Sequence, residues 1–307
     1  MHEIRLSGLD GSNLLGYLAA LGTLRVLSNE RNGADVRMRW SQNGIWTPVV
    51  HHSTIATSDG LLEALEKIVC GEDTVNPAWK IGNDLTLSTG EFRRCLLKSL
   101  TECAGGQRSG VDFLAAFGSE AIGSGPKKEQ MSDTEYRTMS GAGHQHFLGF
   151  MKELAEATSR EHLQRALFEA WDYADGRPSL RWDPADYRPH ALRAEDPSGD
   201  PIKTMRGANR MAVEALPLFP TAPDGRRLKT IAFEDRDREP EVTWPIWSEP
   251  IEVDTVASVL ALSELQRTET DEKERKWFER RGIVQIFRAR RFTEGKYRNF
   301  SPARALL

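Results

Sequence analysis

Apolar residues recur at helical spacing near the start of the chain. Between residues 13 and 28, one stripe carries Leu14, Leu18, Leu21 and Leu24. This spacing predicts a helix that packs one face against a core. The preceding Ile4-Arg5-Leu6 alternates apolar and polar residues and predicts a short strand. Ser12 or Asn13 can cap the helix.

Two extended runs follow, at residues 36–40 and 45–50, and the turn between them contains Asn43-Gly44. Strand-like runs joined by Asn-Gly predict a β-hairpin, because these two residues adopt the positive φ angles of tight hairpin turns. Pro48 has no N–H to donate to a neighbouring strand. The second run is therefore expected at the edge of its sheet.

Helices and short strands alternate along the rest of the chain without regular βαβ spacing. Residues 118–143 hold few apolar side chains and read as one long loop, and residues 177–206 read as irregular. The remaining pattern predicts helices at 61–69, 91–101, 147–154, 160–171, 208–216 and 253–266, an extended segment at 244–247 and a strand at 282–291.

This order favours an α+β fold of mixed short antiparallel strands and helices, with a helical or irregular C-terminal half. We place a boundary near Trp171. It separates an N-terminal α+β domain, residues 1–171, from a C-terminal part, residues 172–307, with a basic tail. The N-terminal domain then contains the long glycine-rich and basic loop, residues 118–146.

Composition points to a cytoplasmic protein. The three cysteines of the 307 residues are widely spaced and form no CxxC pair, which is typical of free thiols in a reducing compartment. The longest apolar run, residues 14–27, is too short and too interrupted to span a membrane, and residues 1–5 do not resemble a secretory signal.

Charge is unevenly distributed. The net charge of −4 weighs against a self-sufficient DNA-binding domain, which is usually basic. From Ile286 to the end, however, six basic residues accompany the single acid Glu294, a local charge of +5. An acidic chain with one basic region suits a subunit that touches nucleic acid on one face and proteins elsewhere.

A first candidate site combines glycines with basic residues. Glycines let backbone N–H groups converge on an anion, and the helix predicted from Phe147 adds partial positive charge at its N-terminus. The order of residues is neither that of a P-loop nor that of a Rossmann motif. A flexible loop that caps the helix, or a small-molecule site, are the alternatives. The predicted phosphate-contacting residues are Lys127, Lys128, Arg137, Ser140, Gly141, Gly143, His144 and Gln145.

Two further basic segments are candidates. Residues 203–210 open a predicted helix with Arg206, Asn209 and Arg210, where ordinary helix capping is the alternative. In the tail, Arg288 and Arg290 share one face of a predicted strand, followed by Arg291. Basic and aromatic residues mingle there, as in platforms for single-stranded nucleic acid. A charged edge strand that resists aggregation is the alternative.

Catalytic signals are weaker. Asp183, Asp186 and His190 could serve a metal-dependent nuclease or hydrolase, although alternating Asp and Arg is more typical of structural ion pairs. No serine lies in a Gly-x-Ser-x-Gly elbow. His144 and His146 lack further ligands at metal spacing. We therefore predict no catalytic residue, metal or cofactor.

Several short motifs resemble type I CRISPR-associated subunits, especially the I-U/I-G group. Leu6-Ser7-Gly8-Leu9 leads into Leu14-Leu15-Gly16-Tyr17-Leu18-Ala19-Ala20-Leu21-Gly22-Thr23-Leu24-Arg25, which resembles the first strand and helix of these proteins. Three later segments are also similar: Ser140-Gly141-Ala142-Gly143-His144-Gln145, Arg181-Trp182-Asp183-Pro184 with Asp186, and Trp244-Pro245-Ile246-Trp247.

The resemblance implies a non-catalytic, large-subunit-like component of an RNA-guided surveillance complex. Such a subunit contacts the crRNA end or the PAM-proximal target DNA, helps to open the target and presents it to a helicase-nuclease. Its partners are crRNA, target DNA and other effector subunits. Base pairing with the guide RNA then recognises most of the target sequence. The protein recognises the nucleic-acid backbone and a short duplex element. A purely structural subunit that binds only proteins is the remaining alternative.

Overall fold

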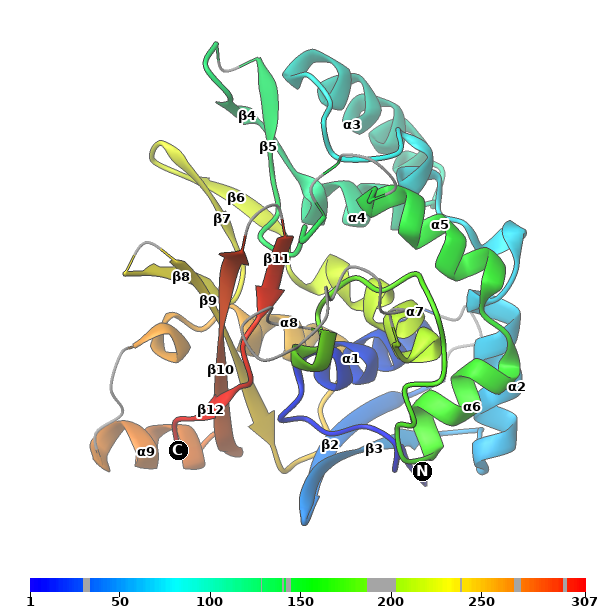
Figure 1. The fold of residues 1–307 in the computed structure, drawn as a ribbon. Coiled ribbons are helices and arrows are strands. Elements are labelled where there is room, and N and C mark those ends of the chain that lie inside the picture. Colours follow the sequence, from blue (N-terminus) through cyan, green and yellow to red (C-terminus); the bar gives the residue numbers. More distant parts are fainter. Residues whose placement is uncertain are drawn as a thin grey trace, which may run out of the picture.

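A computed structural model provides the three-dimensional structure. It describes residues 1–29, 34–127, 129–139, 141, 145–186, 203–237, 239–267, 272–294 and 297–307. Two helices lie at its centre, α1 (Leu14–Ser28) and α7 (Arg206–Ala215) (Figure 1). Strands β8 to β12 lie on one side of this pair, and helices α2, α5 and α6 lie on the other (Figure 1). The arrangement confirms the α+β class.

Helix α1 is buried on every side except at its last residue, Ser28. Asn13 caps it by accepting a hydrogen bond from the Gly16 N–H at 3.1 Å. The close contact with α7 depends on Gly22, where an added Cβ would lie only 1.8 Å from the Met211 carbonyl oxygen. The predicted helix is confirmed, but its surroundings bury far more than one stripe.

The predicted hairpin is confirmed as β2 (Val36–Asn43) and β3 (Ile45–His52), with Gly44 at φ +78° in the turn. With β1 (His2–Arg5) they form a sheet of order β1-β3-β2. The expected edge position of β3 is therefore wrong. β3 tolerates Pro48 because β1 pairs only with residues 49–52, so the proline nitrogen falls beyond that ladder.

The C-terminal half contains more β structure than its sequence indicated. A five-stranded antiparallel sheet has the order β11-β10-β9-β8, and β12 also pairs with β10. Its strands are β8 (Phe233–Arg236), β9 (Glu239–Trp247), β10 (Ile283–Glu294), β11 (Tyr297–Phe300) and β12 (Arg304–Ala305). The predicted strand at 282–291 is thus confirmed as most of β10. An isolated bridge between Met38 and Ile251 links β2 to the segment that follows β9.

The prediction of one long loop at 118–143 is wrong for residues 118–124 and 130–133, which are strands. They form a hairpin of β4 (Gly118–Ser124) and β5 (Gln130–Asp133), because Gly118 lets the strands approach closely: an added Cβ there would lie 2.2 Å from the Ser132 carbonyl oxygen. A second short hairpin joins β6 (Thr221–Asp224) and β7 (Arg227–Thr230). Few apolar residues mark either hairpin, so hydrophobic periodicity did not reveal them.

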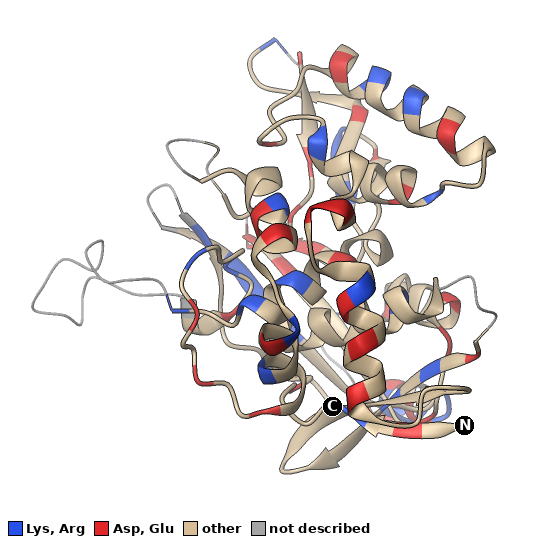
Figure 2. Cartoon of the chain, turned by 90° about the vertical axis from the view of Figure 1, so that its right-hand side faces the viewer, with Lys and Arg blue, Asp and Glu red and all other residues tan. Residues whose placement is uncertain are grey.

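Seven more helices lie around this centre within the described residues. Helix α3 lies along an outer edge of the molecule, with acidic residues towards its ends and basic residues between them (Figure 2). The bounds of these seven helices are α2 (Ser58–Val69), α3 (Thr89–Ala104), α4 (Ser109–Phe117), α5 (Phe147–Ala157), α6 (Arg160–Phe168), α8 (Val253–Leu260) and α9 (Glu272–Glu279).

One main hydrophobic core runs from Ile4 to Phe300, and its members come from both sides of the boundary predicted near Trp171. A smaller cluster lies at the C-terminal end, with Leu265, Phe278, Ile283 and Ile286 fully buried. The division at residue 171 stays a prediction, and the main core crosses it.

Candidate nucleic-acid interface

Arg137 is held inside the fold by carboxylates. Its side chain is 12% exposed, and its guanidinium donates to both Asp84 oxygens, Nε to Oδ1 at 3.0 Å and Nη2 to Oδ2 at 2.7 Å. It also pairs with Asp133. The paired donors hold the loop after β5 against the segment before α3. Arg137 therefore has a structural role that its sequence position did not indicate.

Arg137 belongs to the predicted glycine-rich and basic site at residues 127–145, which we call the glycine segment. The structure describes the rest of this segment only in part. Gly141 has φ +72°, and its N–H donates to the Gln145 carbonyl at 3.1 Å. Lys127 is exposed at the β4–β5 turn and has no ion pair within the described residues. The other predicted residues of this site, Lys128, Ser140, Gly143 and His144, lie outside the described residues.

The second basic segment packs into the interior. Asn209 and Arg210 are fully buried. Arg210 donates from Nε to the Val69 carbonyl at 2.8 Å and from Nη1 to Glu214 Oε1 at 2.8 Å. Asn209 accepts the Leu180 N–H through Oδ1 at 2.9 Å. In this conformation neither side chain can reach a phosphate.

Arg206 begins α7 and is partly exposed. Its N–H donates to Asp175 Oδ2 at 2.8 Å, and its Nη2 donates to the Arg177 carbonyl at 3.2 Å. These contacts tie the start of α7 to the segment that follows α6. Arg206 thus acts mainly as a tether in the described structure.

The tail arginines differ in exposure. Arg288 is buried and donates to Thr243 Oγ1 at 2.8 Å and to the Leu265 carbonyl at 2.9 Å. Burial lowers the pKa of Arg288 to about 10. Arg291 pairs with Glu135 and is 12% exposed, whereas Arg290 is 57% exposed and lies 3.1 Å from Glu239. Only Arg290 of the three presents its charge to solvent.

Asp183, proposed for the metal-dependent alternative, is a buried hydrogen-bond acceptor. Its Oδ1 accepts from Asn13 Nδ2 at 3.0 Å and from the Ala185 N–H at 2.9 Å, and its Oδ2 accepts from the Tyr173 hydroxyl at 3.1 Å. Both oxygens are therefore engaged with protein donors. The Asp186 side chain and all of His190 lie outside the described residues.

An exposed cationic surface lies on α9 and the turn after it. We call it the α9 basic surface, and it comprises Lys273, Arg275, Lys276, Arg280 and Arg281, all exposed. Lys276 pairs with Glu272 at 3.2 Å, and the other four have no carboxylate partner within the described residues. The Arg281 guanidinium stacks over the Trp277 ring at 3.6 Å from its centroid.

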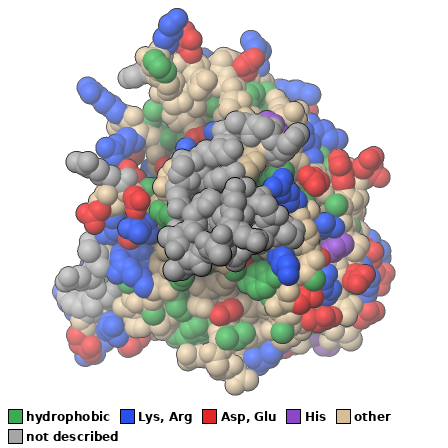
Figure 3. Space-filling view, in the orientation of Figure 1, with side chains coloured by type: hydrophobic (Ala, Val, Ile, Leu, Met, Phe, Trp, Pro, Cys, Tyr) green, Lys and Arg blue, Asp and Glu red, His purple; other side chains and the backbone are tan. Residues whose placement is uncertain are grey.

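This surface belongs to a segment of unusual charge. Residues 272–307 hold eleven Lys and Arg against four Asp and Glu, a net +7, so the preceding residues sum to −11. Elsewhere the charges mix: Figure 3 shows Lys and Arg interspersed with Asp and Glu over one face. The basic tail predicted from Ile286 onward leaves out α9, although Lys273, Lys276 and Arg280 show the i, i+3, i+7 spacing of one helix face.

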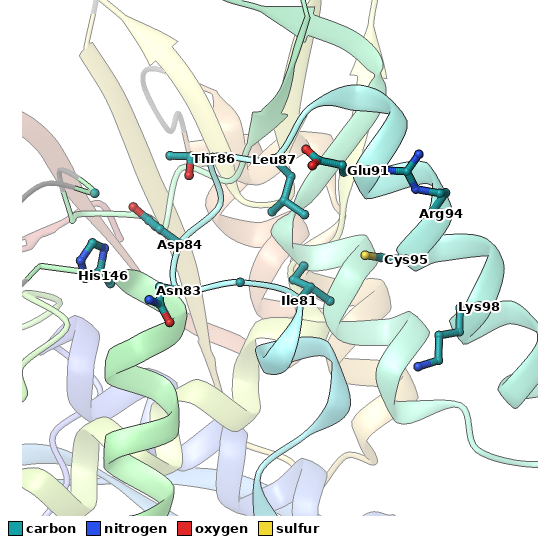
Figure 4. Close-up of a pocket in the computed structure, with 12 residues that line it drawn as sticks. Ile81, Asn83, Asp84, Thr86, Leu87, Glu91, Arg94, Cys95, Lys98 and His146 are labelled. Carbon is teal, nitrogen blue, oxygen red and sulfur yellow. The ribbon is translucent and has the colours of Figure 1, made fainter.

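A second feature is a groove of about 560 Å³ between α3 and the start of α5, which we call the α3–α5 groove. Arg94, Cys95 and Lys98 line it from α3, while residues 81–84, 86 and 87 and His146 line the opposite side (Figure 4). Gly141 lies at its edge, so the described part of the glycine segment borders this groove.

Comparison with known proteins gives no family. No protein-family model matches the chain, and no curated protein sequence matches it. Among the described residues, no group of three or more His, Cys, Asp or Glu side chains is arranged to hold a metal ion. Nor does any described helix have the length and apolar character needed to cross a bilayer.

Proposed function

We propose that this chain is a non-catalytic nucleic-acid-binding subunit of an RNA-guided CRISPR surveillance complex, and that the α9 basic surface contacts the phosphate backbone. The observation that carries the proposal is a group of four exposed cations that have no carboxylate partner within the described residues, Lys273, Arg275, Arg280 and Arg281, in a chain that is acidic before residue 272. The sequence resemblance to type I-U/I-G subunits supports the assignment to an effector complex.

The chemistry of the surface suits a sequence-independent contact. A cation that already pairs with a carboxylate gains little from a phosphate, because it must first give up that partner. Unpaired Arg and Lys gain affinity by releasing condensed counterions from the nucleic acid. Trp277, half-buried beneath Arg281, adds an aromatic face to the surface. Aromatic rings beside guanidinium groups are common in proteins that bind single-stranded nucleic acid, where bases stack on them.

The test compares two double variants with equal changes in charge. Arg280→Gln/Arg281→Gln removes two cations of the α9 basic surface, while Lys67→Gln/Lys80→Gln removes two exposed cations elsewhere. Binding of single-stranded RNA and of duplex DNA is measured by fluorescence anisotropy over a range of salt concentrations. We expect the first variant to flatten the log–log salt dependence by about 0.7 to 0.9 for each lost contact.

Equal slopes for the two variants would remove the α9 basic surface from the proposal. The assignment to an effector complex has its own test, which is co-purification of the tagged protein from its native host with sequencing of the bound RNA. Recovery of crRNA-sized species with a shared repeat-derived end, together with other subunits, supports it. Recovery of protein free of RNA contradicts it.

A second candidate function, a protein-interaction subunit, is favoured by one specific observation. Leu97 and Leu100 on α3 are 56% and 51% exposed, and they lie three residues apart on one helix face. Adjacent exposed leucines are more typical of a contact surface than of a solvated helix. Leu97→Ser/Leu100→Ser would weaken subunit co-purification without altering nucleic-acid binding under this alternative.

A further inference from the structure

We propose that the α3–α5 groove binds a single nucleotide, with its phosphate at Arg94 and Lys98 and its base over the apolar floor of the groove. The inference deepens the proposed function and rests on it, but it assigns a separate site, distinct in its residues from the α9 basic surface. The groove has a volume of about 560 Å³, within the usual range for small-molecule pockets of about 300 to 1,000 Å³.

The two cations of the groove have no ion-pair partner within the described residues, whereas both oxygens of its buried carboxylate, Asp84, are engaged. Arg94 and Lys98 are exposed and have no ion pair within the described residues. Both Asp84 oxygens accept from Arg137, and Oδ1 also accepts the Leu85 N–H at 2.9 Å. The groove therefore has unused donors in excess, which is what a phosphate requires.

The other carboxylate of the groove is also partly satisfied. Glu91 Oε2 accepts from the Ser88 N–H at 2.8 Å and from the Ser88 hydroxyl at 2.7 Å, which completes the capping box of α3. These hydrogen bonds lower the pKa of Glu91, so it stays ionised at neutral pH. Its negative charge lies in the first turn of α3, three residues before Arg94, which also helps to lower the Glu91 pKa, and nearly two turns before Lys98.

The middle of the groove is apolar. Ile81 and Leu87 extend from the segment before α3, and Cys95 extends from α3 towards them (Figure 4). Burial raises the pKa of the Cys95 thiol, so this part of the floor carries no charge at neutral pH. A flat base can pack on such a floor while its phosphate reaches the α3 cations.

Polar groups on the opposite side can read the edge of a base. Asn83 and Thr86 line this side, and both are exposed. His146 also lines it, and its buried Nδ1 has no hydrogen-bond partner within the described residues. A buried polar atom without a partner is costly, so a ligand that supplied one would gain affinity.

The experiment uses the full chain and three variants. Arg94→Ala/Lys98→Ala removes the proposed phosphate contacts, and Thr86→Trp fills the groove from an exposed position without changing charge. Arg93→Ala is the matched control, because Arg93 is an exposed neighbour on α3 that does not line the groove. The probes are AMP and a short single-stranded oligoadenylate, and thermal unfolding verifies that each variant is folded.

We expect both groove variants to weaken oligoadenylate binding about tenfold, the scale of one base held on a stacking surface, and Arg93→Ala to change it much less. Loss of AMP binding in the same variants identifies a free nucleotide as a ligand. Weakened oligoadenylate binding without detectable AMP binding identifies a nucleotide within a strand. Groove variants that behave like Arg93→Ala overturn the proposal.

The two proposals fail in different ways. If the groove variants weaken binding and the α9 variant does not, the groove assignment stands and the α9 basic surface is wrong. If only the α9 variant has an effect, the groove assignment is wrong. If neither AMP nor any nucleic acid binds the purified chain, both are overturned.

Discussion

At the scale of single residues, buried ion pairs stabilise the centre of this molecule. Arg25 and Arg210 approach the same buried carboxylate, at 3.0 Å from Glu214 Oε2 and 2.8 Å from Glu214 Oε1. Arg210 also stacks on Trp79, 5.1 Å from the ring centroid. Here one carboxylate and nearby carbonyls stabilise two guanidinium groups. Loss of the carboxylate would therefore leave two buried cations without a counter-charge.

Glu214→Gln keeps the shape of this side chain but removes the counter-charge of two buried cations. We expect the free energy of unfolding to fall by about 3 kcal/mol, because an uncompensated buried charge is costly. Urea denaturation measures it. The control is Glu63→Gln, which breaks an exposed pair with Lys67 and should cost much less, because solvent screens exposed ion pairs. Equal losses would show that Glu214 is not the critical partner.

His162, at the start of α6, makes a pH-dependent contribution to the stability of the folded protein. Its Nδ1 accepts the Ser159 N–H at 3.1 Å, so this nitrogen carries no proton in the folded state. Burial, the main cause, lowers the pKa of His162 below its ordinary value. The unfolded state then binds more protons. The contribution of His162 to stability is present above about pH 6.5 and is lost as the pH falls towards the folded-state pKa.

His162→Gln removes this titration while a Gln at the same position can still cap the helix. We expect the stability difference between wild type and variant to shift in favour of the variant as the pH is lowered from 7 towards 5. Denaturation curves at several pH values measure the difference. A difference independent of pH would exclude His162 as a source of acid sensitivity.

At the scale of elements, close packing of α1 against α7 decides the fold of the centre. Gly22→Ala places a Cβ 1.8 Å from the Met211 carbonyl oxygen, so the two helices must move apart. Helix propensity alone would favour Ala by about 1 kcal/mol. We nevertheless expect a net destabilisation of about 1 to 3 kcal/mol from overpacking, measured by thermal unfolding.

Gly90→Ala is the matched control, because an added Cβ at this exposed position in α3 meets nothing within 4 Å. Propensity should then be the main effect, and the variant should be neutral or slightly stabilised. If Gly22→Ala behaved in the same way, the close crossing of α1 and α7 would be wrong.

At the scale of the whole molecule, the core crosses the boundary predicted near Trp171. We expect unfolding to be a single cooperative transition, with tryptophan fluorescence and far-UV circular dichroism giving coincident curves. A fragment of residues 172–307 should not fold alone, because it lacks the buried partners that α1 provides for α7. Two separate transitions, or a folded fragment, would instead support the predicted boundary.

Local patterns alone determined much of this architecture. The apolar run of residues 14–27, the Asn43-Gly44 turn and the alternation at 282–291 each predicted an element that the structure confirms. Each depends on periodicity or on turn chemistry, which neighbouring residues fix. The hairpin at 118–133 and helix α9 were missed because they contain few apolar residues, so hydrophobic periodicity carries little signal there.

The choice of candidate surface depended on tertiary structure. A basic residue in the sequence gives no indication of whether distant groups cover it. Arg288 is enclosed by Thr243 and the Leu265 carbonyl, and Arg137 by Asp84, whereas Arg280 has no such partner among the residues that the structure describes. The sequence by itself determined the α+β class, the first helix and hairpin, and the presence of a basic C-terminal region. Only the tertiary structure decided which cations face solvent, because burial is set by contacts between residues far apart in the chain.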